Sequence, residues 1–76
     1  MTYSEQIAAN VRAEVARADL TQKAVASLLG LSTASTSDRF NNRTRFDPDE
    51  LMLLANHLGI DVEIFYKVQA RQAQPA

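Results

Sequence analysis

The sequence predicts a small all-α domain of five short helices. Its 76 residues are enough for one domain, and its apolar residues recur at helical spacing rather than in strict alternation. Polar capping residues precede the predicted helices, and glycine or asparagine follows several of them. We assign residues 1–68 to this domain. Residues 69–76 have too few apolar side chains to pack, so we predict a flexible C-terminal tail there.

The first predicted helix begins at Thr2, which fits a capping box with Glu5. Ile7, Val11 and Val15 then recur every four residues and form an apolar stripe along one helix face. This spacing predicts that the helix packs against the core along that stripe.

Two shorter predicted helices, over residues 22–29 and 33–41, enclose a tight turn. Gly30 suits the end of the first of them, because this position favours a residue that tolerates positive φ. Ser32 is a good N-cap for the second. The pattern therefore predicts two helices that cross closely.

The helix predicted over residues 33–41 has little to bury except Thr36 and Phe40, which lie four residues apart. Its serines and threonines compete for their own backbone, so packing against neighbouring helices must hold it in place. Asn42 comes next and is the best non-glycine occupant of the left-handed region. A helix this polar suggests that its outer face makes the functional contacts.

The fourth predicted helix has strong start and stop signals. Asp47 caps it, Pro48 occupies the first helical position and Glu50 completes a capping box. Gly59 ends it after residue 57 or 58. Asp61 can then cap a short fifth helix over residues 62–66, although the β-branched and aromatic residues of VEIFY also fit a strand.

The chain resembles the helix-turn-helix of phage Cro and CI repressors and the wider Xre-like family over roughly residues 5–66. The matching residues are Thr21-Gln22, Val25-Ala26, Leu29-Gly30-Leu31-Ser32, Asp49-Glu50-Leu51, Leu54-Ala55 and Leu58-Gly59-Ile60. The resemblance implies a five-helix, lambda-repressor-like DNA-binding domain whose third helix enters the major groove.

Three positions depart from the family pattern. Thr36 stands where the family usually has valine or isoleucine, and Asn42 stands where it usually has glycine. Arg39 stands where the family often has an apolar residue, and we expect Phe40 to be buried in its place. We interpret the changes at Thr36 and Arg39 as a slightly rotated recognition helix and not as loss of the motif.

Charge is unevenly distributed along the chain, although the net charge is only −1. Residues 20–46 carry the cations Lys23, Arg39, Arg43 and Arg45 and the single acid Asp38. Residues 47–66 carry acids and neither lysine nor arginine. The basic segment coincides with the two helices that the resemblance places on DNA, which supports an electrostatic role there.

The resemblance also implies which residues contact DNA. The expected base-reading residues of the third helix are Thr33, Ala34, Ser37 and Asp38, and Ser35 is expected near the backbone side. The expected positioning contacts are Gln22, Lys23, Arg39, Asn41, Arg43 and Arg45. Of these, Arg43 and Arg45 lie on a loop and can reach either a phosphate or a minor groove. Neither Thr33 nor Ala34 can make the bidentate contact that glutamine makes with adenine, so part of the specificity should come from DNA shape. Asp38 can accept from cytosine or pair with a neighbouring arginine.

Several classes of function find no support in the composition. The chain has no cysteine and one histidine, and we expect His57 to act as a surface or capping residue. We find no nucleophile–base pair, phosphate-binding glycine loop, metal-ligand spacing or apolar run of membrane-spanning length. We therefore predict a non-enzymatic protein of the bacterial cytoplasm and nucleoid, without cofactor, metal or small-molecule ligand.

The leading hypothesis is a sequence-specific transcriptional regulator, a Cro-like repressor of phage or prophage origin that binds a double-stranded DNA operator. The absence of a second domain favours a Cro-like over a CI-like protein. A homodimer through the fourth helix and residues 62–66 is predicted from surplus apolar side chains such as Met52, Leu53 and Phe65. The alternatives are a protein–protein interaction module, an antitoxin or an excisionase-like protein on the same fold.

Overall fold

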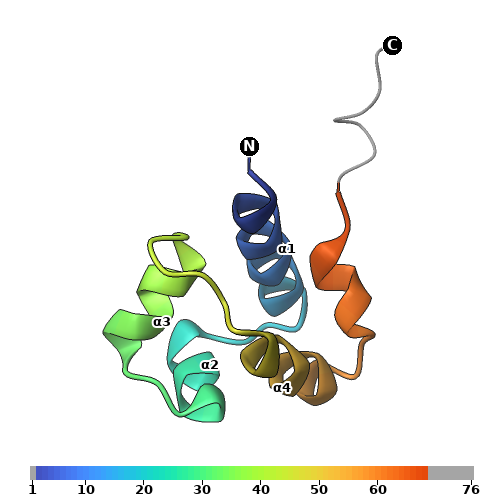
Figure 1. The fold of residues 1–76 in the computed structure, drawn as a ribbon. Helices are drawn as coiled ribbons and strands as arrows, with labels where there is room; N and C mark the ends of the chain where they lie inside the picture. The colour runs from blue at the N-terminus through green and yellow to red at the C-terminus, as the bar shows by residue number, and fades with distance from the viewer. Residues whose placement is uncertain (1, 69–76) are drawn as a thin grey trace.

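The computed structural model describes residues 2–68 and contains four α-helices followed by one 3-10 helix (Figure 1). The α-helices are α1 (Tyr3–Arg17), α2 (Gln22–Leu29), α3 (Thr33–Phe40) and α4 (Pro48–Leu58), and the 3-10 helix is η1 (Val62–Tyr66). The all-α prediction is confirmed, since no strand occurs within residues 2–68. The tail predicted over residues 69–76 lies outside the described residues.

Two details differ from the sequence-based expectation. Helix α3 ends at Phe40 rather than at Asn41, which is instead its C-cap. The fifth helix is a single short 3-10 segment. It begins where the Asp61 carboxylate accepts from the Glu63 amide at 2.9 Å, and the Ile64 amide donates to the Asp61 carbonyl at 3.0 Å. This capped turn settles the choice between helix and strand for VEIFY.

The predicted helix starts are confirmed by their hydrogen bonds. In α1 the Glu5 amide donates to the Thr2 hydroxyl at 3.2 Å and the Thr2 amide donates to the Glu5 carboxylate at 2.6 Å. This bond from the Thr2 backbone holds the pKa of Glu5 below its ordinary value. Asp47 and Glu50 form the same reciprocal capping box at α4.

Four of residues 2–68 have positive φ, and all four lie in turns. Gly30 and Gly59 end α2 and α4 with φ of 69° and 70°. Asn42 has φ of 57°, as predicted for its place after α3. Asp19 also adopts the left-handed conformation, with φ of 61°, which was not predicted from the sequence.

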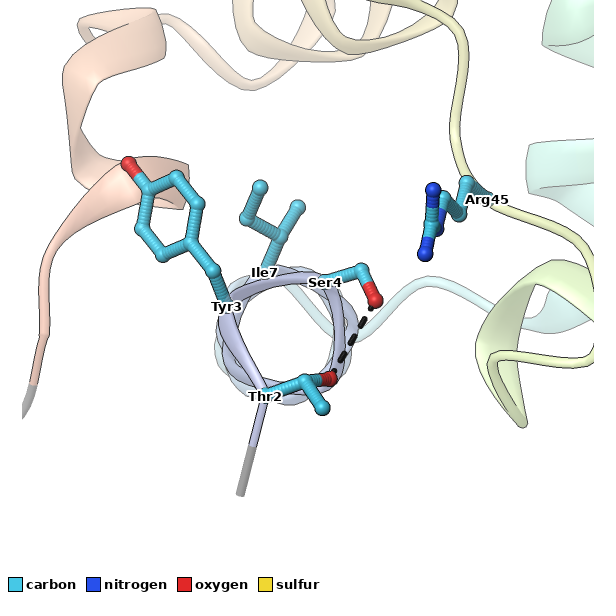
Figure 2. A pocket seen from close by; sticks show the side chains of 5 residues that line it. All are labelled: Thr2, Tyr3, Ser4, Ile7 and Arg45. Carbon is cyan, nitrogen blue, oxygen red and sulfur yellow. Dashed lines mark hydrogen bonds between the residues drawn. The ribbon is translucent and has the colours of Figure 1, made fainter.

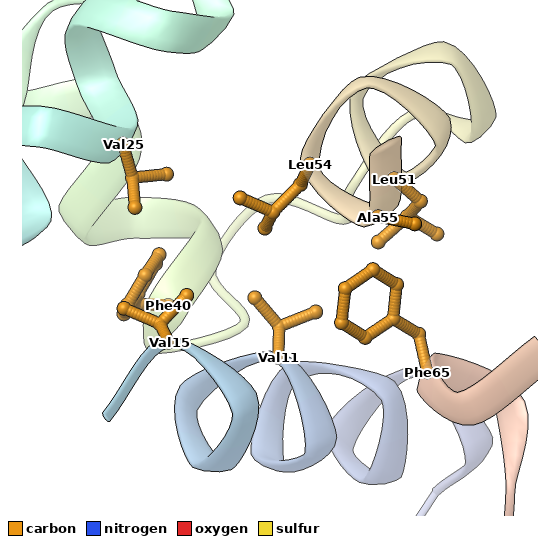
Figure 3. Close-up of a cluster of buried hydrophobic side chains, with 8 residues drawn as sticks. All are labelled: Val11, Val15, Val25, Phe40, Leu51, Leu54, Ala55 and Phe65. Atoms are coloured by element: carbon orange, nitrogen blue, oxygen red, sulfur yellow. The ribbon is translucent and has the colours of Figure 1, made fainter. Parts of the chain in front are cut away.

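One apolar cluster joins all five elements. Its buried members are Val11, Val15, Val25, Phe40, Leu51, Leu54, Ala55 and Phe65 (Figure 3). Figure 3 shows the Phe65 ring of η1 inserted between Val11 of α1 and the side chains of α4. Thr36 and Phe40 are both buried, so they hold α3 against its neighbours as the sequence predicts. The core therefore positions a helix that has poor intrinsic helix propensity.

A set of hydrogen bonds ties α1 to η1 across the bundle. The buried Asn10 side chain donates to the Phe65 carbonyl at 2.9 Å and to the Lys67 carbonyl at 2.7 Å. Gln6, also buried, donates to the Asn10 side-chain oxygen at 3.0 Å, and the Tyr3 hydroxyl donates to the Tyr66 carbonyl at 3.1 Å. Because η1 is too short to satisfy its own last carbonyls, side chains of α1 satisfy them instead.

Candidate nucleic-acid interface

Helices α2 and α3 lie side by side and are joined by a tight turn at one side of the bundle (Figure 1). The Thr21 hydroxyl caps α2 by accepting from the Ala24 amide at 3.0 Å. The Ser32 hydroxyl caps α3 by accepting from the Ser35 amide, also at 3.0 Å. The Leu31 amide closes the turn on the Ala26 carbonyl at 2.9 Å. These bonds fix the angle between the two helices.

The beginnings of α2 and α3 differ electrostatically from those of the other elements. Helices α1 and α4 and the segment η1 each have an acidic residue in the first turn, whereas α2 and α3 have none. Acidic first-turn residues neutralise the positive end of a helix dipole. The two helices of the turn therefore keep unneutralised N-terminal ends, which attract phosphate.

The predicted base-reading residues are short side chains at the beginning of α3. Thr33 and Ala34 are exposed, whereas Ser35, Ser37 and Asp38 are half-buried. The exposed Asn41 side chain donates to the Ser37 carbonyl at 3.0 Å and to the Ser37 hydroxyl at 3.3 Å. Small polar groups thus make up most of this face of the helix.

Gln22 and Lys23 open α2 with exposed side chains. They precede the buried Val25 and Ala26, which anchor the helix in the core. Phosphate oxygens accept hydrogen bonds from side-chain amides and ammonium groups, and they are also attracted to a helix start without acidic residues. The structure thus leaves both predicted phosphate contacts accessible.

Arg43 is folded back toward α3. Its guanidinium lies 3.2 Å from the Asp38 carboxylate, and solvent reaches both side chains. The Arg43 and Thr44 amides donate to the Asp38 carbonyl at 2.8 and 3.3 Å. A solvent-accessible ion pair of this kind is weak, so a phosphate can replace Asp38 as the partner of Arg43.

Arg45 lies on the loop between α3 and α4, opposite the beginning of α1. It lines a pocket of about 400 Å³ together with Thr2, Tyr3, Ser4 and Ile7. Figure 2 shows Arg45 on one side of this pocket and Tyr3 on the other. The Asn42 side-chain amide donates to the Ser4 hydroxyl at 3.3 Å and holds the loop near α1. Within residues 2–68 no acid pairs with Arg45, so its charge is available to a ligand.

The charge of Arg39, unlike that of Arg45, is not available to a ligand. Its Nε donates to the Glu50 carboxylate at 2.8 Å, and the two side chains are only 16% and 14% exposed. Its Nη1 donates to the Ser35 carbonyl at 3.2 Å. The guanidinium is therefore already paired inside the domain. We leave Arg39 out of the DNA contacts proposed below, although the sequence predicted it among them.

Arg12 makes a contact with the end of α3 that was not predicted from the sequence. Its guanidinium donates to the Phe40 carbonyl at the end of α3. It lines a polar pocket of about 300 Å³ together with Glu5, Asn41 and Asn42. No local pattern could have indicated this contact, because it joins residues 28 positions apart in the chain.

The described part of the chain contains no group of three or more histidine, aspartate or glutamate side chains that could hold a metal ion. Among residues 2–68, none of the helices has the length and apolar character needed to cross a bilayer.

The sequence model of a family described as helix-turn-helix matches residues 11–65. This span covers α2, the turn, α3 and α4 and most of α1 and η1. Searches among curated proteins and among solved structures find no match.

Proposed function

Because this chain belongs to the helix-turn-helix family of DNA-binding transcription regulators, we propose that it is a Cro-like repressor of phage or prophage origin. In this proposal α3 enters the major groove of a specific operator, and occupation of the promoter blocks transcription. The observation that carries it is the pair of helix starts free of acidic residues at α2 and α3. The exposed Lys23 stands at the start of α2, and the exposed Arg43 and Arg45 follow the end of α3. This arrangement suits a phosphate backbone that crosses the turn.

The proposed contacts divide into two groups. Phosphates are held by Gln22, Lys23, Asn41, Arg43 and Arg45, which are all exposed. Base edges are read by Thr33, Ala34 and Ser37, with Asp38 close to them. The reading side chains offer hydroxyls and a methyl group, which suit thymine methyls and single hydrogen bonds. DNA shape therefore supplies part of the specificity.

The direct test is anisotropy-detected binding to DNA from upstream of the protein's own gene, beside a scrambled duplex, at low and near-physiological salt. We expect preference for the native fragment to survive the higher salt. Equal binding to both duplexes that disappears with salt would reflect backbone attraction alone and would contradict a sequence-specific regulator with this operator. The acidic stretch of residues 47–66 would then direct attention to a protein partner.

Removing the loop cations should weaken DNA binding through its salt-dependent component. Arg43→Ala and Arg45→Ala are each expected to reduce the slope of log K against log salt by about 1. The measurement is a salt titration on one duplex. Lys67→Ala removes one cation from the exposed surface beyond η1 and serves as the matched control. If both arginine variants keep the slope of the unaltered protein, the proposed groove docking is wrong.

We propose further that the protein binds an inverted repeat as a homodimer. Met52 and Leu53 on α4 are 48% and 49% exposed, which makes them the large apolar side chains available on that helix. In the segment 62–66, Val62, Phe65 and Tyr66 pack against the core of their own domain, and Phe65 is wholly buried. We therefore propose that the homodimer interface consists of the outer face of α4 alone, without residues 62–66.

Placing a charge on that face should prevent the dimer. Leu53→Asp is expected to sediment as a monomer and to lose affinity for an inverted repeat while keeping its affinity for a single half-site. Ala13→Asp adds the same charge to the exposed side of α1 and should change neither property. A monomeric unaltered protein, both free and on DNA, would contradict the dimer.

A further inference from the structure

One carboxylate oxygen of Glu50 joins α3 to α4. Oε1 accepts from the Asp47 amide at 3.0 Å, which completes the cap of α4, and from Arg39 Nε at 2.8 Å. Arg39 in turn donates to the Ser35 carbonyl at 3.2 Å, one turn back along α3. Of the ion pairs in the described residues, this is the one that connects two helices. Both side chains are almost covered, so solvent screens the pair less than it screens the Arg43–Asp38 pair.

The Arg39–Glu50 pair connects α3 to a helix other than the two that α3 mainly packs against. Helix α3 packs mainly against α1 and α2 through the buried Thr36 and Phe40. Arg39 lies beside Phe40 and extends toward α4, which is itself anchored in the core by Leu51 and Leu54. The ion pair thus restrains rotation of α3 about the axis of its two buried residues.

Because of the residues proposed to read bases, a rotation of α3 should change how well the domain discriminates between DNA sequences. Thr33, Ala34 and Ser37 have short side chains, so a change of rotamer cannot compensate for a displaced backbone. A long glutamine or arginine can still reach a base after a small shift of the helix, but a hydroxyl or methyl group cannot. Base discrimination then depends on where the core and its ion pairs place the helix.

We propose that Glu50, acting through Arg39, is a positioning residue for DNA recognition that sets how α3 presents Thr33, Ala34 and Ser37 to base edges. This inference rests on the proposed DNA-reading function of α3. In this proposal Arg39 links α3 to α4 inside the domain and does not contact phosphate. The pair therefore governs discrimination between sequences and leaves attraction to the phosphate backbone unchanged.

The experiment compares two duplexes, the one that the unaltered protein enriches most from a random-sequence pool and a shuffled version of the same composition. The readout is the ratio of the two dissociation constants at one salt concentration.

Glu50→Gln keeps an oxygen for the Asp47 amide but removes the charge that holds Arg39. We expect it to reduce the ratio about tenfold, the value of one good base contact, with little change for the shuffled duplex. Partial unfolding cannot imitate this result, because it weakens both affinities by the same factor.

Two further variants make the test specific. Asp49→Asn removes a charge from the same first turn of α4 without touching Arg39, and its ratio should equal that of the unaltered protein. Arg39→Gln should reduce the ratio as Glu50→Gln does, and the double variant should add little, since the two residues act as a pair.

The inference and the proposed function fail in different ways. If the unaltered protein prefers the selected duplex and Glu50→Gln prefers it equally, the positioning role is wrong and the reading function stands. The positioning role is also wrong if Asp49→Asn and Glu50→Gln reduce the ratio alike. If the unaltered protein enriches no sequence from the pool, the reading function is wrong and the inference falls with it.

Discussion

Replacing Phe65 with alanine is expected to destabilise the domain by about 3–5 kcal/mol, as the loss of a buried aromatic ring commonly does. The ring has no exposed surface and lies in the apolar cluster between α1 and α4 (Figure 3). No neighbouring element can close the cavity easily, because each is already held by its own caps and contacts. A domain of this length has roughly 5–10 kcal/mol in total, so the variant should be close to unfolding. Urea denaturation followed by circular dichroism measures the change.

Val68→Ala provides the comparison for Phe65→Ala. The Val68 side chain is 58% exposed, so truncation should shift the free energy of unfolding by less than about 1 kcal/mol. If the two variants have the same urea midpoint, η1 does not belong to the cooperatively folded core. The Phe65→Ala variant should also lose DNA affinity for selected and shuffled duplexes alike, because it lowers the folded population.

Replacing Asn10 with alanine should have the second-largest effect, about 2–4 kcal/mol, although it removes little apolar area. The change leaves the carbonyls of Phe65 and Lys67 without this donor and deprives Gln6 of its acceptor inside the domain. Thermal unfolding measures the loss. Asn56→Ala on the exposed face of α4 is the matched control and should be neutral or slightly stabilising, because alanine is the better helix former. An Asn10 variant as stable as the control would show that the link between α1 and η1 is dispensable.

Much of the fold could be predicted from the sequence because its signals are local. The capping boxes at Thr2 and Asp47, and the left-handed residues Gly30 and Asn42, depend on neighbours within a few positions of the chain. The bounds of each helix were therefore predicted from the sequence to within about one residue. The spacing of Thr36 and Phe40 was also sufficient to identify the buried side of a helix whose composition resembles a linker.

The features that escaped prediction involve partners distant in sequence. Asn10 meets a carbonyl 55 residues away, and Arg39 meets a carboxylate 11 residues away in another helix. No role was predicted for Asn10, and Arg39 was predicted to contact DNA, because the neighbouring residues in the sequence carry no information about these partners. Asp19 is different, since its left-handed conformation is local, but aspartate is an uncommon occupant of that region and gave no clear signal.

The candidate interface was predictable in its location and less so in its details. The sequence located the cations near the third helix, but it could not distinguish the available Arg45 from the paired Arg39. That difference arises from α4, which brings Glu50 beside α3 from 11 positions further along the chain. The DNA contacts themselves remain predictions for the titrations described above.

The bonds between α1 and η1 also bear on how the chain acquires its structure during synthesis. A growing chain emerges with its amino-terminal end first, so α1 leaves the ribosome before Phe65 does. Until then Val11 and Leu54 lack the ring that covers them, and Asn10 lacks the carbonyls it binds. Helix α3, which needs a completed core, cannot be stable any earlier. We therefore expect the nascent protein to become competent for DNA only after residue 67 has emerged, in one late step instead of helix by helix.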